Sequence, residues 1–417
     1  MNSIRNLQII TALDSLSYGL LYRYFPEATI INLGGTNITV AYYLTGVFVA
    51  NFFAPQISTI MTGHCNGKKQ KLFFSLTLTM FTKVMMAITR SYWTLIFMRL
   101  VFSAIDQTQH FCFNLLQEKE QTENRHLKGS FQLLNFTVLS GSGFIIGPII
   151  SGFFFDMKHG FRIITMLAAL LTLTNIILLG KIDEDCLCNR SYCERTSSFT
   201  TKPVSDGTRE SLKKAKLSKN WDIILIQFLF ASSYLIFSNE FPKIMSYNYQ
   251  VTSSFAIGST IAYMNTLVFA CNKFASNVMR NIDNYPIIFA SELLFFITTT
   301  FMFLVCYAPT YELFLLLLPP IVFLHSLINA AIWEGLYEER NNEHLNKLNN
   351  NDLALDLAGF TIPILFAVAH NRFKHNAVII FTFMPLLMCW LVTKFYSRFL
   401  KIEDAQCVVR DVNDVLF

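Results

Sequence analysis

The chain has 417 residues, of which 53% are hydrophobic and only 15% are charged, and its formal net charge is +5. So little polar surface cannot cover a water-soluble globule of this length, which excludes an ordinary soluble domain and indicates an integral membrane protein. The small positive charge is interpreted as a feature of membrane topology and not of nucleic-acid binding.

Apolar runs of the length that crosses the hydrocarbon core as a helix, about 20 residues, recur along the whole chain. Barrel strands would be shorter and would alternate polar with apolar residues, which these runs do not. The sequence therefore predicts an all-α polytopic membrane protein with twelve transmembrane helices. The predicted spans are 7–26, 40–62, 71–90, 93–116, 130–155, 160–180, 221–243, 255–276, 284–306, 311–333, 353–371 and 375–397.

The loops between these spans differ in charge. Of the 33 lysines and arginines, 24 fall in segments on one side of the membrane and only 6 on the other. Because cytoplasmic loops carry the excess of Lys and Arg, the asymmetry predicts that both termini are cytoplasmic. The sequence does not distinguish the plasma membrane from an organelle membrane.

A polar interval follows the sixth span and divides the chain into two halves. It is rich in Ser, Thr, Lys and Arg and lacks apolar periodicity, which is typical of a linker. Six-helix halves joined in this way are typical of secondary transporters, whose solute site lies near the bilayer midplane. The predicted organisation is an N-terminal six-helix bundle at 1–180, a cytoplasmic linker at 181–220, a C-terminal six-helix bundle at 221–397 and a cytoplasmic tail at 398–417.

Ionisable side chains inside the predicted spans are the candidates for function, because each is costly at membrane depth unless it is paired or faces water. A proton-coupled carrier needs a carboxylate that takes up a proton from one side and releases it to the other. Asp14, Asp106 and Glu292 could serve. Arg99 is the candidate cation, two helical turns before Asp106, so each is expected to face another helix. The alternative is a fixed interhelical ion pair, which applies most to Lys83.

The stretch "GSGFIIGPIISG", residues 141–152, concentrates glycine within a span. Gly143 and Gly147 lie on one helix face, where small residues allow helix backbones to approach closely in lipid. Pro148 removes a backbone hydrogen bond and is expected to kink the helix or make it pliable. The pattern fits a moving interface and a fixed packing seam equally well.

This stretch resembles the fifth-helix motif of the major facilitator superfamily, G-x(3)-G-P-x(2)-G-G, which is associated with twelve-span drug–proton antiporters. Gly143, Gly147, Pro148 and Gly152 match it. The opening "LDSLSYGLLYRYFPE" is similar to the first helix of tetracycline exporters. The resemblance implies the major facilitator fold and a proton-coupled secondary transporter of a small organic solute that works by rocker-switch alternating access.

The predicted loop between spans two and three, "IMTGHCNGKK", resembles the superfamily pattern G-x(3)-D-R-x-G-R-K only in part. Gly67, Lys68 and Lys69 match, whereas His64 stands in place of the aspartate. In the family this aspartate helps to lock the cytoplasmic gate. A neutral histidine there implies a weaker lock.

Motifs of common enzymes, such as a P-loop, G-x-S-x-G, H-E-x-x-H and a dinucleotide fingerprint, do not occur in the sequence. The chain is therefore not expected to be an enzyme, and no cofactor or metal is predicted. The expected partners are a small-molecule solute, protons and the lipid bilayer, without nucleic acid, and the protein is expected to be monomeric. An alternative is a non-transporting scaffold, sensor or chaperone of an internal membrane, which the altered loop favours.

Overall fold

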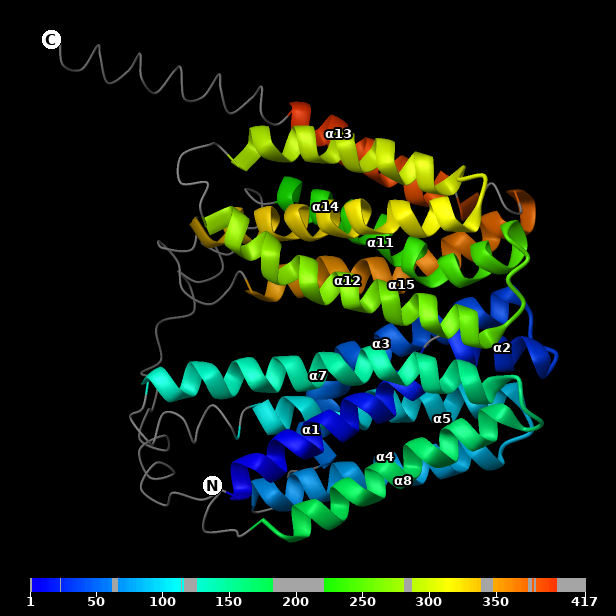
Figure 1. Cartoon of the computed structure of the whole chain (residues 1–417), viewed down its shortest axis with the longest axis vertical. Coiled ribbons are helices and arrows are strands. Elements are labelled where there is room, and N and C mark those ends of the chain that lie inside the picture. Colours follow the sequence, from blue (N-terminus) through cyan, green and yellow to red (C-terminus); the bar gives the residue numbers. More distant parts are fainter. Residues whose placement is uncertain are drawn as a thin grey trace, which may run out of the picture. The chain divides into compact units, whose positions relative to one another are not determined.

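Helices are the regular elements throughout the described part of the chain (Figure 1). No strand occurs in those residues, so the all-α fold class predicted from composition is confirmed. The computed structural model describes residues 2–22, 24–61, 67–113, 115, 126–182, 221–280, 287–338, 348–373, 377–378 and 380–395.

The helices follow the predicted spans closely in most of the chain. Those before the polar interval are α1 (Asn2–Leu20), α2 (Tyr24–Asn32), α3 (Asn37–Met61), α4 (Lys68–Ile88), α5 (Tyr92–Ile105), α7 (His126–Phe155) and α8 (Gly160–Gly180). Those after it are α11 (Trp221–Asn248), α12 (Ser254–Arg280), α13 (Ile287–Cys306), α14 (Tyr311–Glu338) and α15 (Leu348–Phe373), with a further apolar helix at Ile380–Phe395.

Seven helices in the described ranges are long and apolar enough to cross a bilayer. They lie in α3, α4, α7, α8, α12, α14 and α15, and shorter apolar helices occur at Phe295–Val305 and Ile380–Phe395. The chain is therefore an integral multi-pass membrane protein. The full number of spans and the cytoplasmic location of the termini stay predictions.

Two predicted spans differ from the helices observed. The first was expected at 7–26, but α1 ends at Leu20 and a separate helix, α2, begins at Tyr24. Proline is favoured in the first turn of a helix, so Pro26 starts α2 and does not extend α1. The fourth was expected as one helix at 93–116, but it is interrupted: α5 ends at Ile105, Asp106 leaves the helical conformation with φ −72° and ψ 89°, and helix resumes at 108–113. Arg99 and Asp106 therefore do not share an unbroken helix.

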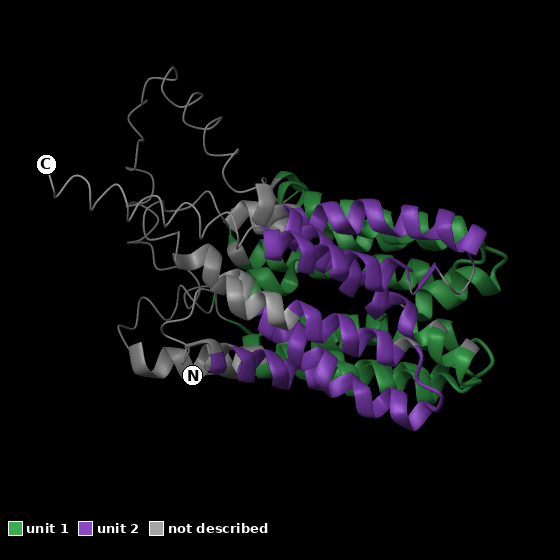
Figure 2. Cartoon of the chain, turned by 90° about the horizontal axis from the view of Figure 1, so that it is seen from above, with its two compact units in different colours: residues 1–206, 242–266 green, residues 207–241, 267–417 purple. Residues whose placement is uncertain are grey.

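The chain forms two compact units, coloured separately in Figure 2. The first comprises Met1–Asp206 and Pro242–Thr266, and the second comprises Gly207–Phe241 and Leu267–Phe417. The predicted six-plus-six division at 1–180 and 221–397 stays a prediction. Within the first unit, α1 packs on α7 and α8, α4 packs on α5 and α8, and α3 packs on α5.

Two apolar clusters form the described core of the first unit. The same helices contribute to both, because α1, α4 and α8 each carry apolar residues near both ends. One cluster holds Leu20, Leu21, Ile30, Val40, Tyr43, Leu44, Val47, Met86, Leu95, Ile96, Ile164 and Ala168. The other holds Leu7, Ile10, Leu72, Leu76, Cys112, Leu115, Leu179 and Ile182.

Candidate functional site

A layer of buried polar side chains separates the two apolar clusters of the first unit. In α1, Asp14 and Ser17 fall between Ile10 of one cluster and Leu20 of the other. In α4 and α8, buried polar residues likewise lie between members of the two clusters, and in α5 they follow Leu95 and Ile96. Polar groups so far from both helix ends lie deep in the bilayer, where each needs a partner within the protein. The buried polar layer consists of Asp14, Ser17, Thr79, Thr82, Lys83, Arg99, Ser103, Thr172 and Asn175.

Lys83 is held by hydroxyl groups from two other helices. Its side chain has no exposed surface, and its Nζ donates hydrogen bonds of 2.8 Å to Ser17 Oγ and 2.8 Å to Thr172 Oγ1. The ammonium group also lies 5.0 Å from the centroid of the Phe102 ring. Charge-assisted bonds and a ring face offset the loss of hydration, so Lys83 can be buried without a carboxylate bonded to it.

Arg99 is held mainly by aromatic faces. It is 1% exposed, and its guanidinium carbon lies 4.6 Å from the Phe102 ring centroid and 5.2 Å from that of Tyr18. A side-chain hydrogen bond joins it to Tyr43. Within the described residues its Nε and Nη1 atoms have no hydrogen-bond partner. A buried donor without a partner is costly, so Arg99 keeps capacity for a further acceptor.

Asp14 of the layer and the half-buried Asp106 beside it interact with these cations through space. Asp14 is 2% exposed and interacts electrostatically with Asp106 and Lys83. Lys83 interacts in turn with Asp106, Asp14 and Arg99. Within the described part of the chain, neither carboxylate forms a direct ion pair with either cation. The structure thus brings the predicted Asp14, Arg99 and Asp106 into one electrostatic cluster and adds Lys83.

A second set of polar side chains lies beside this cluster and was not predicted. Gln109 Nε2 donates to Ser15 Oγ at 3.1 Å, and Ser140 Oγ donates to Gln109 Oε1 at 3.3 Å. Asn175 is fully buried, and both of its amide atoms lack a partner among the described residues. The sequence signal that could have revealed these residues is the recurrence of polar residues at helical spacing within apolar runs, as at Asp14 and Ser17.

The glycines of α7 lie directly against the backbone of α1. A Cβ atom added at Gly147 would lie 2.6 Å from the Gly19 Cα, and one at Gly143 would lie 2.6 Å from the Ser15 Cβ. Ser151 Oγ completes this face with a 2.6 Å hydrogen bond to the Leu20 carbonyl. The close approach expected of small residues in lipid is therefore present.

The opposite side of the motif packs on the start of α12, whose residues up to Thr266 belong to the first unit. An added Cβ at Gly258 would lie 3.3 Å from the Gly152 Cα and would also meet the carbonyl oxygen of Pro148. Asp156 accepts hydrogen bonds from Ser254 N at 3.0 Å and from Ser254 Oγ at 2.5 Å. Its carboxylate therefore caps α12, a role that the sequence did not suggest.

Comparison with known proteins agrees with this arrangement. Residues 135–341 match the sequence profile of the Major Facilitator Superfamily. The structure of the nucleoside transporter NupG has a TM-score of 0.68 at 14% identity, and the match covers 96% of this chain and 100% of that chain. The profile match supports the Major Facilitator Superfamily, and the structural match shows a shared fold.

Other transporters of known structure share the superfamily fold. A D-xylose–proton symporter has a TM-score of 0.62 at 12% identity, covering 93% of this chain and 97% of that chain. The human organic anion transporter MFSD10 (TETRAN) has a TM-score of 0.56 at 13% identity, covering 94% and 99%. No curated protein matches the sequence. Likenesses at these identities establish the fold alone.

Of the predicted superfamily gate loop, residues 62–66 are outside the described part of the chain, whereas both of its ends are described. His64 lies outside the described residues, and Gly67 is the N-cap of α4. Lys68 is the first residue of α4, but its side chain is not described. Lys69 Nζ donates a 2.5 Å hydrogen bond to the carbonyl of Ile182, just after α8. The role of this loop as a gate stays a prediction.

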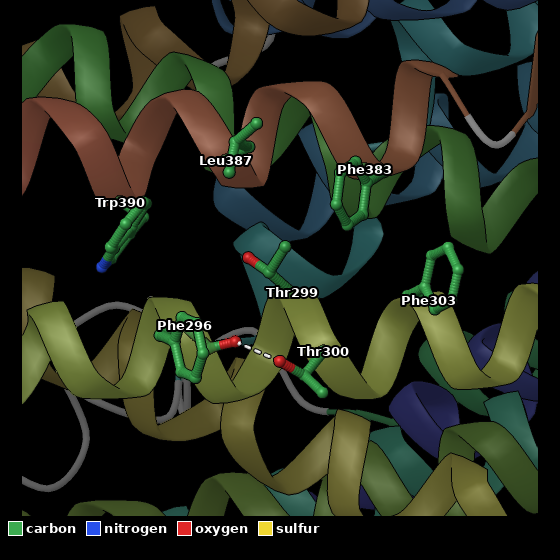
Figure 3. Close-up of a pocket in the computed structure, with 7 residues that line it drawn as sticks. All are labelled: Phe296, Thr299, Thr300, Phe303, Phe383, Leu387 and Trp390. Atoms are coloured by element: carbon green, nitrogen blue, oxygen red, sulfur yellow. Dashed lines mark hydrogen bonds between the residues drawn. The ribbon is translucent and has the colours of Figure 1, made fainter.

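One cavity of the second unit is apolar. Figure 3 shows Phe296 and Phe303 of α13 facing Phe383, Leu387 and Trp390 of the helix Ile380–Phe395. The hydroxyls of Thr299 and Thr300 donate to carbonyls of their own helix. The lining therefore offers ring faces and few free polar atoms.

Two further ionisable residues, Glu292 and His325, lie within helices of the second unit. Glu292 lies in α13, but its side chain is outside the described part, so its predicted role is untested. His325 of α14 stacks on Tyr234 at 3.7 Å and on Phe230 at 4.4 Å between ring centroids. This sandwich favours a packing role for the histidine.

Proposed function

We propose that the protein is a secondary active transporter that moves a small organic solute by rocker-switch alternating access, coupled to protons. The observation that carries the proposal is the cluster of the buried Asp14, Lys83 and Arg99 with the half-buried Asp106. The shared fold with solved transporters and the match to the superfamily profile support the same class of function.

The arrangement of the four charges suits proton coupling. Each carboxylate lies within electrostatic range of a cation, but neither is bonded directly to one in the described part of the chain. Burial favours the neutral, protonated form of a carboxyl group, whereas nearby cations favour the charged form. Because these two effects oppose each other, a carboxylate without a fixed partner can take up a proton at a modest cost in free energy. Asp14 is therefore proposed as the group that loads and releases the proton.

Within the superfamily, the fifth-helix and first-helix motifs favour the branch of drug–proton antiporters and tetracycline exporters. We further propose that the chain is similar to an animal protein, major facilitator superfamily domain-containing protein 9. On this proposal the solute is an amphipathic organic molecule exported against protons. Its direct contacts would include Arg99, whose Nε and Nη1 donors have no partner among the described residues.

The test is solute flux in liposomes that contain the purified protein and carry a pH gradient. The solute panel covers nucleosides, pentoses, peptides and organic anions, the solutes named for the solved transporters of this fold, together with amphipathic drugs. We expect Asp14→Asn to abolish flux driven by the gradient, because the amide cannot carry the proton. Glu312→Gln, at the exposed start of α14, is the matched control and should transport normally.

If no solute moves and Asp14→Asn behaves as the unaltered protein, the transporter proposal fails. That result would favour the alternative of a non-transporting scaffold, sensor or chaperone.

A further inference from the structure

A cavity of about 360 Å³ opens at one end of the first unit, where the ends of five helices meet. It is lined by the end of α2, the end of α4, the start of α5, the end of α7 and the start of α8. Figure 1 shows α2 and the turn between α7 and α8 at the same end of this bundle. The cavity is separate from the buried polar layer, and none of the charged residues of that layer lines it.

The charged residues that line this cavity are all basic or potentially basic. They are Arg90, His159 and Arg162, and no carboxylate is among the lining residues. None of their three side chains makes a hydrogen bond or an ion pair with another described residue. The carboxylate of Asp156, next to the lining residue Met157, is already bonded to Ser254. The cavity therefore holds cationic donors that the described protein does not neutralise.

The neutral polar residues of the cavity are Thr29, Asn32 and Thr89, and the exposed amide of Asn32 adds a neutral donor and acceptor. The Thr29 hydroxyl donates to the carbonyl of Phe25, and the Thr89 hydroxyl donates to that of Ser91. Neither hydroxyl hydrogen is free to satisfy a second acceptor. A ligand of this cavity would thus meet mainly guanidinium and imidazole groups, which bind an anion and above all a phosphate.

The position of these arginines is unusual for the chain. Arg90 and Arg162 belong to the 6 basic residues, of 33, on the side predicted to be non-cytoplasmic. The positive-inside rule disfavours Lys and Arg in short loops on that side. Arg90 and Arg162, two of the few basic residues on that side, line the same cavity. Membrane topology does not explain them, so a binding role is indicated.

Aromatic and apolar residues near the cavity are of the kinds that occur at the depth of lipid headgroups. Trp93, at the start of α5, is 57% exposed and lies 5.2 Å from Tyr92 between ring centroids. Such residues are enriched at the interface between membrane and water. Leu33 and Met157, which line the cavity, also present exposed apolar surface beside the cationic groups.

We propose that this cavity binds the phosphate headgroup of an anionic phospholipid from the non-cytoplasmic leaflet. Arg90 and Arg162 hold the phosphate, His159 contributes a further donor, and the acyl chains lie outside the cavity against Leu33 and Met157. The volume suits a headgroup and excludes a whole lipid. The combination of cations with an exposed apolar rim favours a lipid over a soluble phosphate ester, which would leave that rim in water.

Lipid binding is tested by native mass spectrometry of the purified full chain, titrated with phosphatidylglycerol or phosphatidylcholine. We expect tighter binding of phosphatidylglycerol. The double variant R90Q/R162Q should weaken that binding about thirtyfold, and each single variant about fivefold, because each guanidinium contact is lost separately. Lys158→Gln removes an exposed cation of the same turn that does not line the cavity, and it should bind as the unaltered protein.

Two further measurements keep the test decisive. The variant R90K/R162K retains the charge and should lose only a few-fold in affinity, and the melting temperature of every variant in phosphatidylcholine reports its folding. The site would be overturned if R90Q/R162Q bound phosphatidylglycerol as tightly as the unaltered protein, or if Lys158→Gln lost as much affinity as R90Q/R162Q. If inorganic phosphate or glycerol phosphate raised the melting temperature as much as phosphatidylglycerol does, the lipid would be overturned as the occupant. None of these assays depends on transport, so the proposal stands or falls separately from the proposed function.

Discussion

The two units bury ionisable side chains in different ways. In the first, Lys83 is bonded to hydroxyls from two other helices and lies within electrostatic range of two carboxylates. In the second, His325 is enclosed by the rings of Phe230 and Tyr234. A group surrounded by polar partners can exchange them during a conformational cycle, whereas a stacked ring is part of the packed core. The position of a charge within a span therefore does not by itself indicate a functional role.

The largest expected effect comes from removing the cation at the centre of the polar layer. Lys83→Met should reduce the free energy of unfolding by about 3–5 kcal/mol, because it leaves the buried Asp14 and the half-buried Asp106 with one cation in place of two. Thermal unfolding in detergent measures the change. Lys158→Met, at an exposed position, is the control and should change stability by less than about 0.5 kcal/mol. If the two variants are equally stable, the four charges do not form one electrostatic unit.

Substitution of two glycines by alanine should affect stability in different ways. One glycine lies in the close contact of α7 with α1, and the other lies in open space at the end of α8. Gly147→Ala should destabilise the protein by about 1–3 kcal/mol, because its methyl group meets the backbone at Gly19. Gly180→Ala, at the end of α8, has no atom within 4 Å of the added Cβ. It should be neutral or stabilising by up to about 1 kcal/mol, since glycine is the weaker helix former.

The same melting experiment measures both glycine variants. A loss of stability at Gly180 equal to that at Gly147 would mean that the effect is a general cost of alanine and not of helix contact. Flux measured with folded Gly147→Ala would also show whether this seam is fixed or moves, which the glycine spacing left open.

The class of fold could be predicted from the sequence because the length and polarity of a membrane helix are set by the bilayer. Most spans were placed well: the sixth, predicted at 160–180, coincides with α8. The errors occurred where local chemistry ends a helix inside an apolar run. Asp106 is one case and Pro26 is the other. Hydrophobicity averaged over a span does not register such single residues.

The candidate site could be predicted only in part. The charges Asp14, Arg99 and Asp106 stood out because ionisable groups are rare in apolar runs. Their surroundings did not, since Ser17, Thr172 and Tyr43 are ordinary residues whose importance depends on which helices lie side by side. Lys83 was visible in the sequence as well, but its bonding to hydroxyls in place of a carboxylate depends on tertiary packing.

The smallest expected effect distinguishes the two units most directly. His325→Phe keeps an aromatic ring of similar size between Phe230 and Tyr234, so it should change stability by less than about 1.5 kcal/mol. It should also leave the pH dependence of solute flux unchanged, because a stacked imidazole in the core carries no transported proton. Asp14→Asn in the same liposomes is the contrasting variant. A shift in the pH dependence with His325→Phe would place a proton-carrying group in the second unit, and coupling would then involve both units.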